Sequence, residues 1–256
     1  MKNIITLLRP HQYVKNIFIF APLVFAFNFS QDAFLNAGIA FVLFSLLASS
    51  IYIFNDYMDI EEDKKHPSKK KRPLASGAIS KKTAQLLFSI LSITVLVLAF
   101  IFSLPLFFVL AVYFLLNIVY SLKLKHIAIV DIFIISTGFV LRLFAGSLVT
   151  DTPLSMWIII ITFLLAIFLA LAKRRDDVLL SLAGKETRKN IDGYNLEFVN
   201  AAMVLMAGVV IVSYLQYTVS AEVISRIGSE HLFLTTFFVI LAIFRYMQIT
   251  FVEEKS

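Results

Sequence analysis

The sequence predicts an all-α fold, a polytopic membrane helical bundle of about eight transmembrane helices in a single domain, residues 1–256. Of its residues, 59% are hydrophobic and 16% are charged, whereas soluble globular proteins contain roughly 45–50% apolar residues. A spanning helix needs about 20 apolar residues, and the hydrophobic runs supply enough for about eight. This excludes a soluble enzyme and a disordered chain. The absence of cysteine excludes disulfides and cysteine metal sites.

The elements follow in chain order. Met1–Leu8 is a short amphipathic stretch stopped by Pro10, and we interpret it as an interfacial helix. It has neither the long apolar stretch nor the cleavage site of a signal peptide. The first expected span is short and contains Pro22. The apolar runs predict eight spans, at Val14–Phe29, Ala33–Phe54, Thr83–Phe102, Pro105–Tyr120, Ile127–Leu148, Pro153–Ala172, Phe198–Val219 and His231–Thr250.

Positive charges mark one side of the membrane. Of the 23 Lys and Arg residues, all but Arg142 and Arg226 lie at the termini or in alternate loops. The positive-inside rule therefore places both termini in the cytoplasm, for a multi-pass protein of the cell membrane. The net charge of +6 is then a topology signal, and we expect no nucleic-acid partner. The long polar loops 55–82 and 173–197 face the cytoplasm and are the expected catalytic loops.

The second span ends in an acidic motif, N-D-Y-M-D-I-E-E-D at residues 55–63. At about 100° per residue, a continuous helix places Asp56, Asp59 and Asp63 on one face together with Asn55. Like charges so placed repel one another unless something positive lies among them. Hard oxygen ligands without His or Cys suit Mg²⁺, so we predict that these four residues bind magnesium. The alternative is a solvated helix end at the membrane surface.

A basic loop follows, from Lys64 to Gly77. Such a run is most often a topology anchor attracted to anionic lipid. Carboxylates beside cations are also what a metal–pyrophosphate site requires, because the acids hold Mg²⁺ and the cations neutralise the remaining phosphate oxygens. On this interpretation Lys65 and Arg72 bind substrate, and His66 is a turn residue.

Two ionisable residues lie in the fifth span. Asp131 and Arg142 are eleven residues apart, so they share a helix face but lie roughly 16 Å apart, too far to pair. Charges within a membrane indicate a functional or cavity-lining role. Asp131, near Lys125 at the cytoplasmic end, is the better candidate for the site, whereas we expect Arg142 to be structural and to snorkel.

The pattern N-D-x-x-D-x-x-x-D at residues 55–63, followed by H-P-x-K-x-x-R-P-L-A-x-G at 66–77, resembles the UbiA-type superfamily of intramembrane prenyltransferases. Further segments are similar to its decaprenyl-phosphate phosphoribosyltransferase branch. These segments are R-P-H-Q-Y-V-K-N at 9–16, Y-S-x-x-L-K-H at 120–126 with Asp131, L-R at 141–142 with A-G at 145–146, K-R at 173–174, and T-R-K-N at 187–190 with Tyr194. The resemblance extends from about residue 9 to residue 246.

The resemblance implies typically nine spans around a central cavity open to the cytoplasm. It also implies transfer of 5-phosphoribosyl from phosphoribosyl pyrophosphate to a polyprenyl phosphate in the bilayer, with Mg²⁺ as the cofactor and pyrophosphate released. Whether the protein forms a homo-oligomer is left open. The expected catalytic residues are Asp56, Asp59, Asp63, Lys125 and Asp131. The expected substrate-binding residues are Lys15, Asn16, Asn55, Lys65, Arg72, Tyr120, Lys173, Arg174, Arg188, Lys189 and Tyr194.

Two features depart from the superfamily. Its members carry a second aspartate-rich motif after the sixth span, where this chain has K-R-R-D-D at residues 173–177. Cations there suit an acceptor that is itself a phosphate, and a phosphate monoester is already an anion that needs no general base. The chain also stops just after the eighth expected span, at Ser256.

Two alternative functions stay open. A UbiA-type prenyltransferase that moves an isoprenyl group from its diphosphate to an aromatic acceptor would need a second acid cluster, which this chain lacks. A transporter of phospholipids or polyprenyl phosphates would carry intramembrane carboxylates along a pathway. The acids here crowd at one cytoplasmic end instead, which favours the enzyme.

Overall fold

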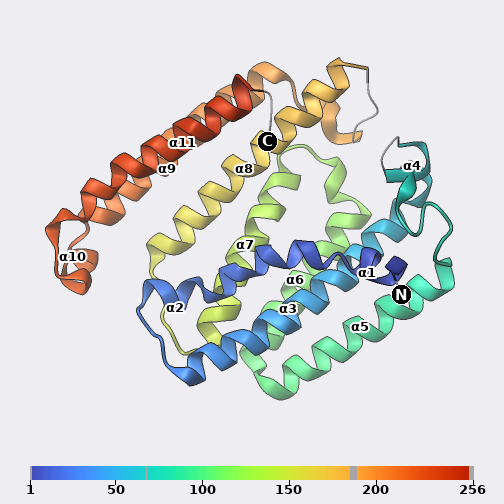
Figure 1. The fold of residues 1–256 in the computed structure, drawn as a ribbon, viewed down its shortest axis with the longest axis horizontal. Coiled ribbons are helices and arrows are strands. Elements are labelled where there is room, and N and C mark those ends of the chain that lie inside the picture. Colours follow the sequence, from blue (N-terminus) through green and yellow to red (C-terminus); the bar gives the residue numbers. More distant parts are fainter. Residues whose placement is uncertain (1, 67–68, 185–188, 254–256) are drawn as a thin grey trace. The chain divides into compact units, whose positions relative to one another are not determined.

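A computed structural model describes residues 2–66, 69–184 and 189–253, without the side chains of 189 and 190, and within these ranges it contains helices and turns but no strand (Figure 1). The α-helices are α1 (Lys2–Leu8), α2 (Ala21–Phe25), α3 (Gln31–Met58), α4 (Ile60–Lys65), α5 (Lys81–Phe102), α6 (Leu104–Leu122), α7 (Val130–Val149), α8 (Met156–Leu182), α9 (Leu196–Val219), α10 (Ala221–Ile227) and α11 (Thr236–Phe251). The 3₁₀ helices are η1 (Pro10–Phe20), η2 (Lys69–Lys71), η3 (Leu124–His126), η4 (Lys189–Gly193) and η5 (Glu230–Thr235).

Seven stretches of the described chain are long and apolar enough to cross a membrane, namely α3, α5, α6, α7, α8, α9 and the continuous stretch Glu230–Phe251. Each corresponds to one predicted span, and each starts within three residues of the predicted position. One boundary is wrong. The helix α8 continues ten residues past Ala172, so the first part of the expected loop 173–197 is helical.

Side-chain caps begin six of these stretches. Ser30, Ser80, Ser103 and Ser155 accept a hydrogen bond from a backbone N–H in the first turn of α3, α5, α6 and α8. Asn195 does the same for α9 and Ser229 for Glu230–Phe251. Such caps satisfy N–H groups that the helix itself leaves without an acceptor. They fix the points at which these helices begin.

The first predicted span, Val14–Phe29, is not a single α-helix. The chain there forms the 3₁₀ helix η1 and then the five-residue α2, with Pro22 near its start. A 3₁₀ helix rises about 2.0 Å per residue against about 1.5 Å for an α-helix. Counted from Pro10, η1 and α2 together extend roughly 30 Å, but their part inside the predicted span extends only roughly 22 Å, less than the thickness of a hydrocarbon core. An eighth span stays a prediction.

The polar side chains that join η1 to α3 have the same spacing along both helix axes. Tyr13 and Asn16, three residues apart on η1, hydrogen-bond Ser49 and Ser45, four residues apart on α3, both at 2.8 Å. Three residues of a 3₁₀ helix and four of an α-helix both rise about 6 Å. The two stripes of polar groups therefore stay in register.

A glycine lets η1 approach α7. A Cβ atom on Gly146 would lie 1.8 Å from the carbonyl oxygen of Ile19, so no larger residue fits without backbone movement. Ile19 is fully buried at this contact. This close approach explains why the second residue of the A-G pair at 145–146 is a glycine.

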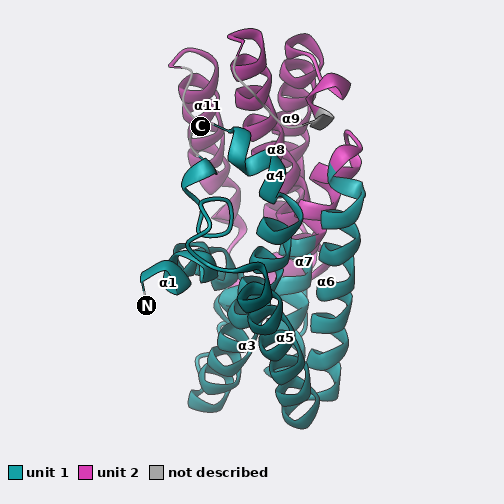
Figure 2. Ribbon diagram, turned by 90° about the vertical axis from the view of Figure 1, so that its right-hand side faces the viewer, with its two compact units in different colours: residues 1–125, 138–154 teal, residues 126–137, 155–256 magenta. Residues whose placement is uncertain are grey.

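The chain divides into two compact units, coloured separately in Figure 2. In the first, residues 1–125 and 138–154, α3 packs against α5, α6 and η1 around Phe44, Leu47 and Leu110. In the second, residues 126–137 and 155–256, α9 packs against α8 and α11 around Phe168 and Met203. Each unit has its own apolar core, and each holds one of the charged clusters described next.

Candidate active site

The acidic motif lies where α3 passes into α4. The helix α3 ends at Met58 and α4 starts at Ile60, but the backbone N–H groups of Asp59 and Asp63 still donate to the carbonyls four residues earlier, at 3.0 and 2.8 Å. The expected continuous helix is therefore interrupted at Asp59, although Asp59 and Asp63 themselves keep helical hydrogen bonds. Asp56 and Asp63 are both buried, and Asp59 is partly exposed.

Two arginines neutralise the buried acids of the first unit. Asp56 Oδ1 accepts from Arg9 Nη2 at 2.5 Å and from Arg72 Nη1 at 3.0 Å, and the same Arg72 atom donates to Asp63 Oδ2 at 2.7 Å. Burying a carboxylate is costly unless it is paired and hydrogen-bonded. The basic loop therefore supplies Arg72 to the acids, whereas the sequence selected Arg72 only as a ligand of substrate phosphate, a role that stays a prediction. The contribution of Arg9, 47 positions from Asp56, was not predicted.

The third aspartate has a separate partner. Asp59 is paired with Lys125, which follows α6 in the first unit. The sequence selected both residues for the site, and the structure brings them together. Glu61, in contrast, lies outside the cluster, because its exposed carboxylate is bound by Lys64 at 2.9 Å, which lowers the pKa of Glu61.

The donors of the motif fit a hard divalent cation. Among the described residues no three His, Cys, Asp or Glu side chains form a ready metal site, since each aspartate is paired with a cation instead. However, one guanidinium nitrogen bridges Asp56 and Asp63, in the way that a metal ion could. The buried Oδ1 of Asn55 has no hydrogen-bond donor within the described residues. Oxygen ligands of this kind suit Mg²⁺, provided that Arg72 moves.

A second charged cluster lies in the second unit. Asp131, at the start of α7, is fully buried and binds Arg174 Nε of α8 at 2.8 Å. Arg174, itself 1% exposed, also pairs with Asp177. Tyr194 donates its hydroxyl proton to Asp131 Oδ1 at 2.6 Å. The structure thus joins three residues that the sequence selected separately. Their burial favours a role in holding the site over direct contact with substrate.

This network stabilises a strained turn. Ile129 has φ of 70°, a left-handed conformation in which a β-branched residue is an outlier. Its N–H donates to the Tyr194 hydroxyl at 2.7 Å. Burial and the bond to Asp131 raise the pKa of Tyr194, so the hydroxyl keeps its proton and the network stays intact at neutral pH.

Arg175, next to Arg174, was not selected from the sequence. It is buried, donates to Asn200 Oδ1 at 3.0 Å and to the Thr250 carbonyl at 2.6 Å, and its guanidinium lies over the ring of Phe251. A cation at the last turn of α11 is favoured by the helix dipole. Arg175 therefore fixes α11 within the second unit.

Arg142 is structural, as expected, but it does not snorkel. It is buried in the first unit, where it donates to Asn16 Oδ1 at 2.7 Å and to the Gly138 carbonyl at 2.6 Å. Its guanidinium lies over the ring of Phe44, 4.8 Å from the centroid. Asn16 is consequently bonded on both amide atoms, beside a part of α3 about 16 Å before Asp56. The structure does not bring this expected substrate ligand to the aspartates.

The other expected site residues are placed less specifically. Lys15, Lys65 and Lys173 are exposed, and Tyr120 is half-buried near the end of α6. Arg188 and the side chain of Lys189 lie outside the described residues. Their assignment to substrate binding stays a prediction.

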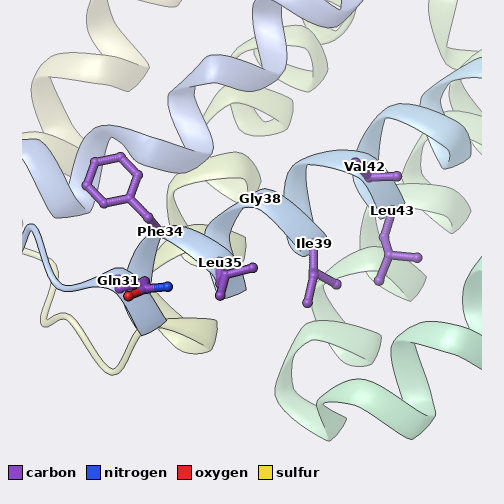
Figure 3. A pocket seen from close by; sticks show the side chains of 7 residues that line it. All are labelled: Gln31, Phe34, Leu35, Gly38, Ile39, Val42 and Leu43. Atoms are coloured by element: carbon purple, nitrogen blue, oxygen red, sulfur yellow. The ribbon is translucent and has the colours of Figure 1, made fainter.

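A shallow hollow lies elsewhere on α3, between Gln31 and Leu43, and Figure 3 shows its largely apolar side chains. It is separated from Asp56 by thirteen residues, about 20 Å of helix. It holds no charged residue and is not part of the candidate site.

The family model described as the UbiA prenyltransferase family matches residues 16–255. The chain belongs to this family. Its relatives include the decaprenyl-phosphate phosphoribosyltransferase of Mycolicibacterium smegmatis, 33% identical over 220 residues, which are 84% of this chain and 69% of the relative. The protein of the same name from Mycobacterium tuberculosis is 31% identical over 218 residues, 83% of this chain and 72% of that relative.

Solved structures agree on the UbiA fold. A UbiA homolog from Archaeoglobus fulgidus bound to GPP and Mg²⁺ matches with a TM-score of 0.75 at 18% identity, covering 96% of this chain and 86% of that one. The predicted all-helical membrane class and the predicted family are therefore confirmed. The protein is a multi-pass membrane protein and a UbiA-family transferase.

Proposed function

We propose that the protein transfers 5-phosphoribosyl from phosphoribosyl pyrophosphate to a polyprenyl phosphate and releases pyrophosphate. The observation that carries this proposal is the similarity, over more than four fifths of the chain, to relatives named decaprenyl-phosphate phosphoribosyltransferase. The exposed Lys173 supports it, because the acceptor is an anion, whereas Arg174 and Arg175 are held by buried partners within the second unit.

Mg²⁺ is the proposed cofactor, held by Asn55, Asp56, Asp59 and Asp63. When bound, it offsets the negative charge that grows on pyrophosphate as it leaves the ribose. Arg72 and Lys125 are already in contact with these acids, and Lys65 ends α4, two residues after Asp63. We assign these three cations to the phosphate oxygens of the donor, because an ionised donor group forms the stronger hydrogen bonds to phosphate.

The chemistry exchanges one bond for another at the ribose C1. The bond from C1 to the pyrophosphate oxygen breaks, and a bond from C1 to an oxygen of the lipid phosphate forms. No proton has to leave the attacking oxygen of a phosphate monoester dianion, so no general base is required. We assign the acceptor phosphate to Lys173, Arg188 and Lys189, and we assign Asp131, Arg174 and Tyr194 the task of holding that region in place.

We place this reaction at the cytoplasmic face of the cell membrane, with both termini in the cytoplasm. The distribution of Lys and Arg supports this orientation. The proposed catalytic loops then face the compartment in which a soluble, highly charged donor is dissolved, while the lipid acceptor stays in the bilayer.

The test uses the full chain purified in detergent, incubated with MgCl₂, phosphoribosyl pyrophosphate and a short polyprenyl phosphate. We expect pyrophosphate and a phosphoribosylated lipid in equal amounts, and no product in EDTA. Asp59→Asn is expected to abolish turnover, whereas Arg245→Gln, a matched change at an exposed ion pair with Glu253, is not. Prenylation of 4-hydroxybenzoate from an isoprenyl diphosphate, with no reaction of phosphoribosyl pyrophosphate, would contradict the proposal.

A further inference from the structure

The pairing of Arg9 with Asp56 has no part in the function proposed above. Arg9 and Arg72 together contribute two positive charges, and Asp56 and Asp63 contribute two negative charges. This group of four, which we call the acid–arginine quartet, is balanced in charge. Its two carboxylates are nearly inaccessible, 2% and 3% exposed, so nothing needs to bind there for the charges to be compensated.

The structure holds Arg9 firmly in this position. Leu7, two residues earlier, is fully buried in an apolar cluster with Ile53 and Ile60. The backbone of Arg9 has φ of 53°, an uncommon conformation for a residue other than glycine. Its guanidinium lies 5.2 Å from the centre of the Tyr52 ring. An arginine brought to a buried acid at the cost of backbone strain indicates a specific task.

The charge balance of the quartet constrains metal binding. If a divalent cation joined Asp56 and Asp63 while both guanidinium groups stayed, the group would carry two surplus positive charges in a mostly buried place. Such a surplus is costly unless an anion accompanies it. A diphosphate would supply that anion, and the planar fork of arginine matches phosphate oxygens.

We propose that Arg9 is a further ligand of the donor's diphosphate, and that Arg9 and Arg72 occupy the acids until that diphosphate arrives. The guanidinium groups then exchange carboxylate oxygens for phosphate oxygens, which leaves Asp56 and Asp63 as residues that would hold the metal. Metal and diphosphate therefore bind together, each weakly without the other. This inference rests on the proposed function in assigning a diphosphate-bearing donor to this site.

The experiment measures binding without turnover. The full chain in detergent is titrated with MgCl₂ alone, with sodium pyrophosphate alone and with both, while the melting temperature and the heat of binding are recorded. We expect the wild-type protein to respond weakly to either alone and strongly to both. Mg²⁺ and pyrophosphate also associate in solution, but that association is the same for every variant and cancels in the comparison.

The variant Arg9→Gln gives the decisive result. Without the guanidinium on Asp56, Mg²⁺ alone is expected to bind several-fold more tightly. Pyrophosphate with Mg²⁺ is expected to bind about 10- to 100-fold more weakly, as loss of one charge-assisted contact implies. A merely structural Arg9 would weaken both. Equal losses of both affinities, or two affinities within twofold of the wild-type values, would overturn the proposal.

Two further variants keep the test informative. Arg9→Lys retains the charge on Asp56 but not the fork, so Mg²⁺ alone should bind as in the wild type and Mg²⁺–pyrophosphate several-fold more weakly. Unchanged pyrophosphate binding in Arg9→Lys would overturn the proposal even if Arg9→Gln did not fold. Arg245→Gln, outside the quartet, should match the wild type in both titrations.

The outcomes also separate this inference from the proposed function. Coupled binding of Mg²⁺ and pyrophosphate that depends on Arg9, in a protein that does not use phosphoribosyl pyrophosphate, would support the inference and refute the proposed function. The protein could instead turn over phosphoribosyl pyrophosphate while Arg9→Gln leaves the affinities for Mg²⁺ and for Mg²⁺–pyrophosphate unchanged. That result would support the proposed function and refute this inference.

Discussion

The expected effect of neutralising Asp56 on stability differs between the sequence and the structure. The spacing of the motif suggests three carboxylates that repel one another, so that neutralising one would relieve strain. In the structure Asp56 is 2% exposed and paired with Arg9 and Arg72. The long-range partners decide the sign of the effect, and no local pattern in the sequence identifies them.

Asp56→Asn is therefore expected to lower stability as well as to abolish turnover. Removing the charge leaves two guanidinium groups for one carboxylate, at a cost of about 1–3 kcal/mol. Thermal unfolding in detergent measures the effect. Asp32→Asn, in the exposed first turn of the same helix, is the matched control and should change stability by less than about 1 kcal/mol. A melting temperature of Asp56→Asn at or above that of the wild type would show that repulsion dominates.

The Tyr194 hydroxyl has a comparable role in the second unit. Tyr194→Phe leaves the N–H of Ile129 without its acceptor and removes one of the donors to Asp131, which keeps its ion pair with Arg174. We expect a loss of about 1–3 kcal/mol, with activity reduced because the turn at Ile129 relaxes. Tyr217→Phe, which removes a hydroxyl without a hydrogen bond in the described chain, is the control. Equal melting temperatures of the two variants would contradict the prediction.

At the scale of elements, close packing of helices depends on single positions. Gly146→Ala places a Cβ atom 1.8 Å from the Ile19 carbonyl oxygen, so η1 or α7 must shift. Overpacking of this kind costs about 1–3 kcal/mol. Gly208→Ala on α9, where nothing lies within 4 Å of the added atom, should be neutral or stabilise by up to about 1 kcal/mol. Denaturation of both variants in detergent tests the difference, and equal stability would contradict the assigned contact.

The positions of most helices could be predicted from the sequence. Hydrophobic runs place the seven membrane-spanning stretches, because a run of apolar residues is a local signal. The helix η1 could not be predicted, because its 3₁₀ winding depends on contacts with α3 and with Gly146, far away in the chain. The extension of α8 past Ala172 was missed for a related reason, since Arg174 and Arg175 find buried partners only in the folded protein.

At the scale of the whole molecule, the charge distribution predicts orientation. The chain has no cysteine, so single cysteines can be introduced and labelled with a membrane-impermeant maleimide in intact cells. Ser225→Cys, beside Arg226 on the side with few cations, should react. Ser76→Cys, in the basic loop, should react only after the membrane is permeabilised. Both residues are exposed, so the reverse pattern would place the termini outside the cytoplasm.

The sequence predicted only some residues of the candidate site, namely those that belong to recognisable motifs. The acids, Arg72 and Lys125 belong to motifs of the family, and the structure brings them into contact. Arg9 stood in such a motif but was not selected, since its partner is 47 positions away. Asn16 was selected for the site, yet its amide is occupied by Ser45 and Arg142. A motif therefore identifies residues under constraint without separating those that bind substrate from those that hold the helices.

The matched spacing of η1 and α3 limits how this protein can change in length during evolution. Loss of one residue from η1 between Tyr13 and Asn16 would turn the remaining contacts by about 120° and shift them by about 2 Å along the axis. The polar pairs with Ser45 and Ser49 would then separate. Deletions that keep the pairing must remove three residues from η1 for every four removed from α3. We therefore expect homologous chains to vary in length in the connecting segments and to keep this pair of helices free of gaps.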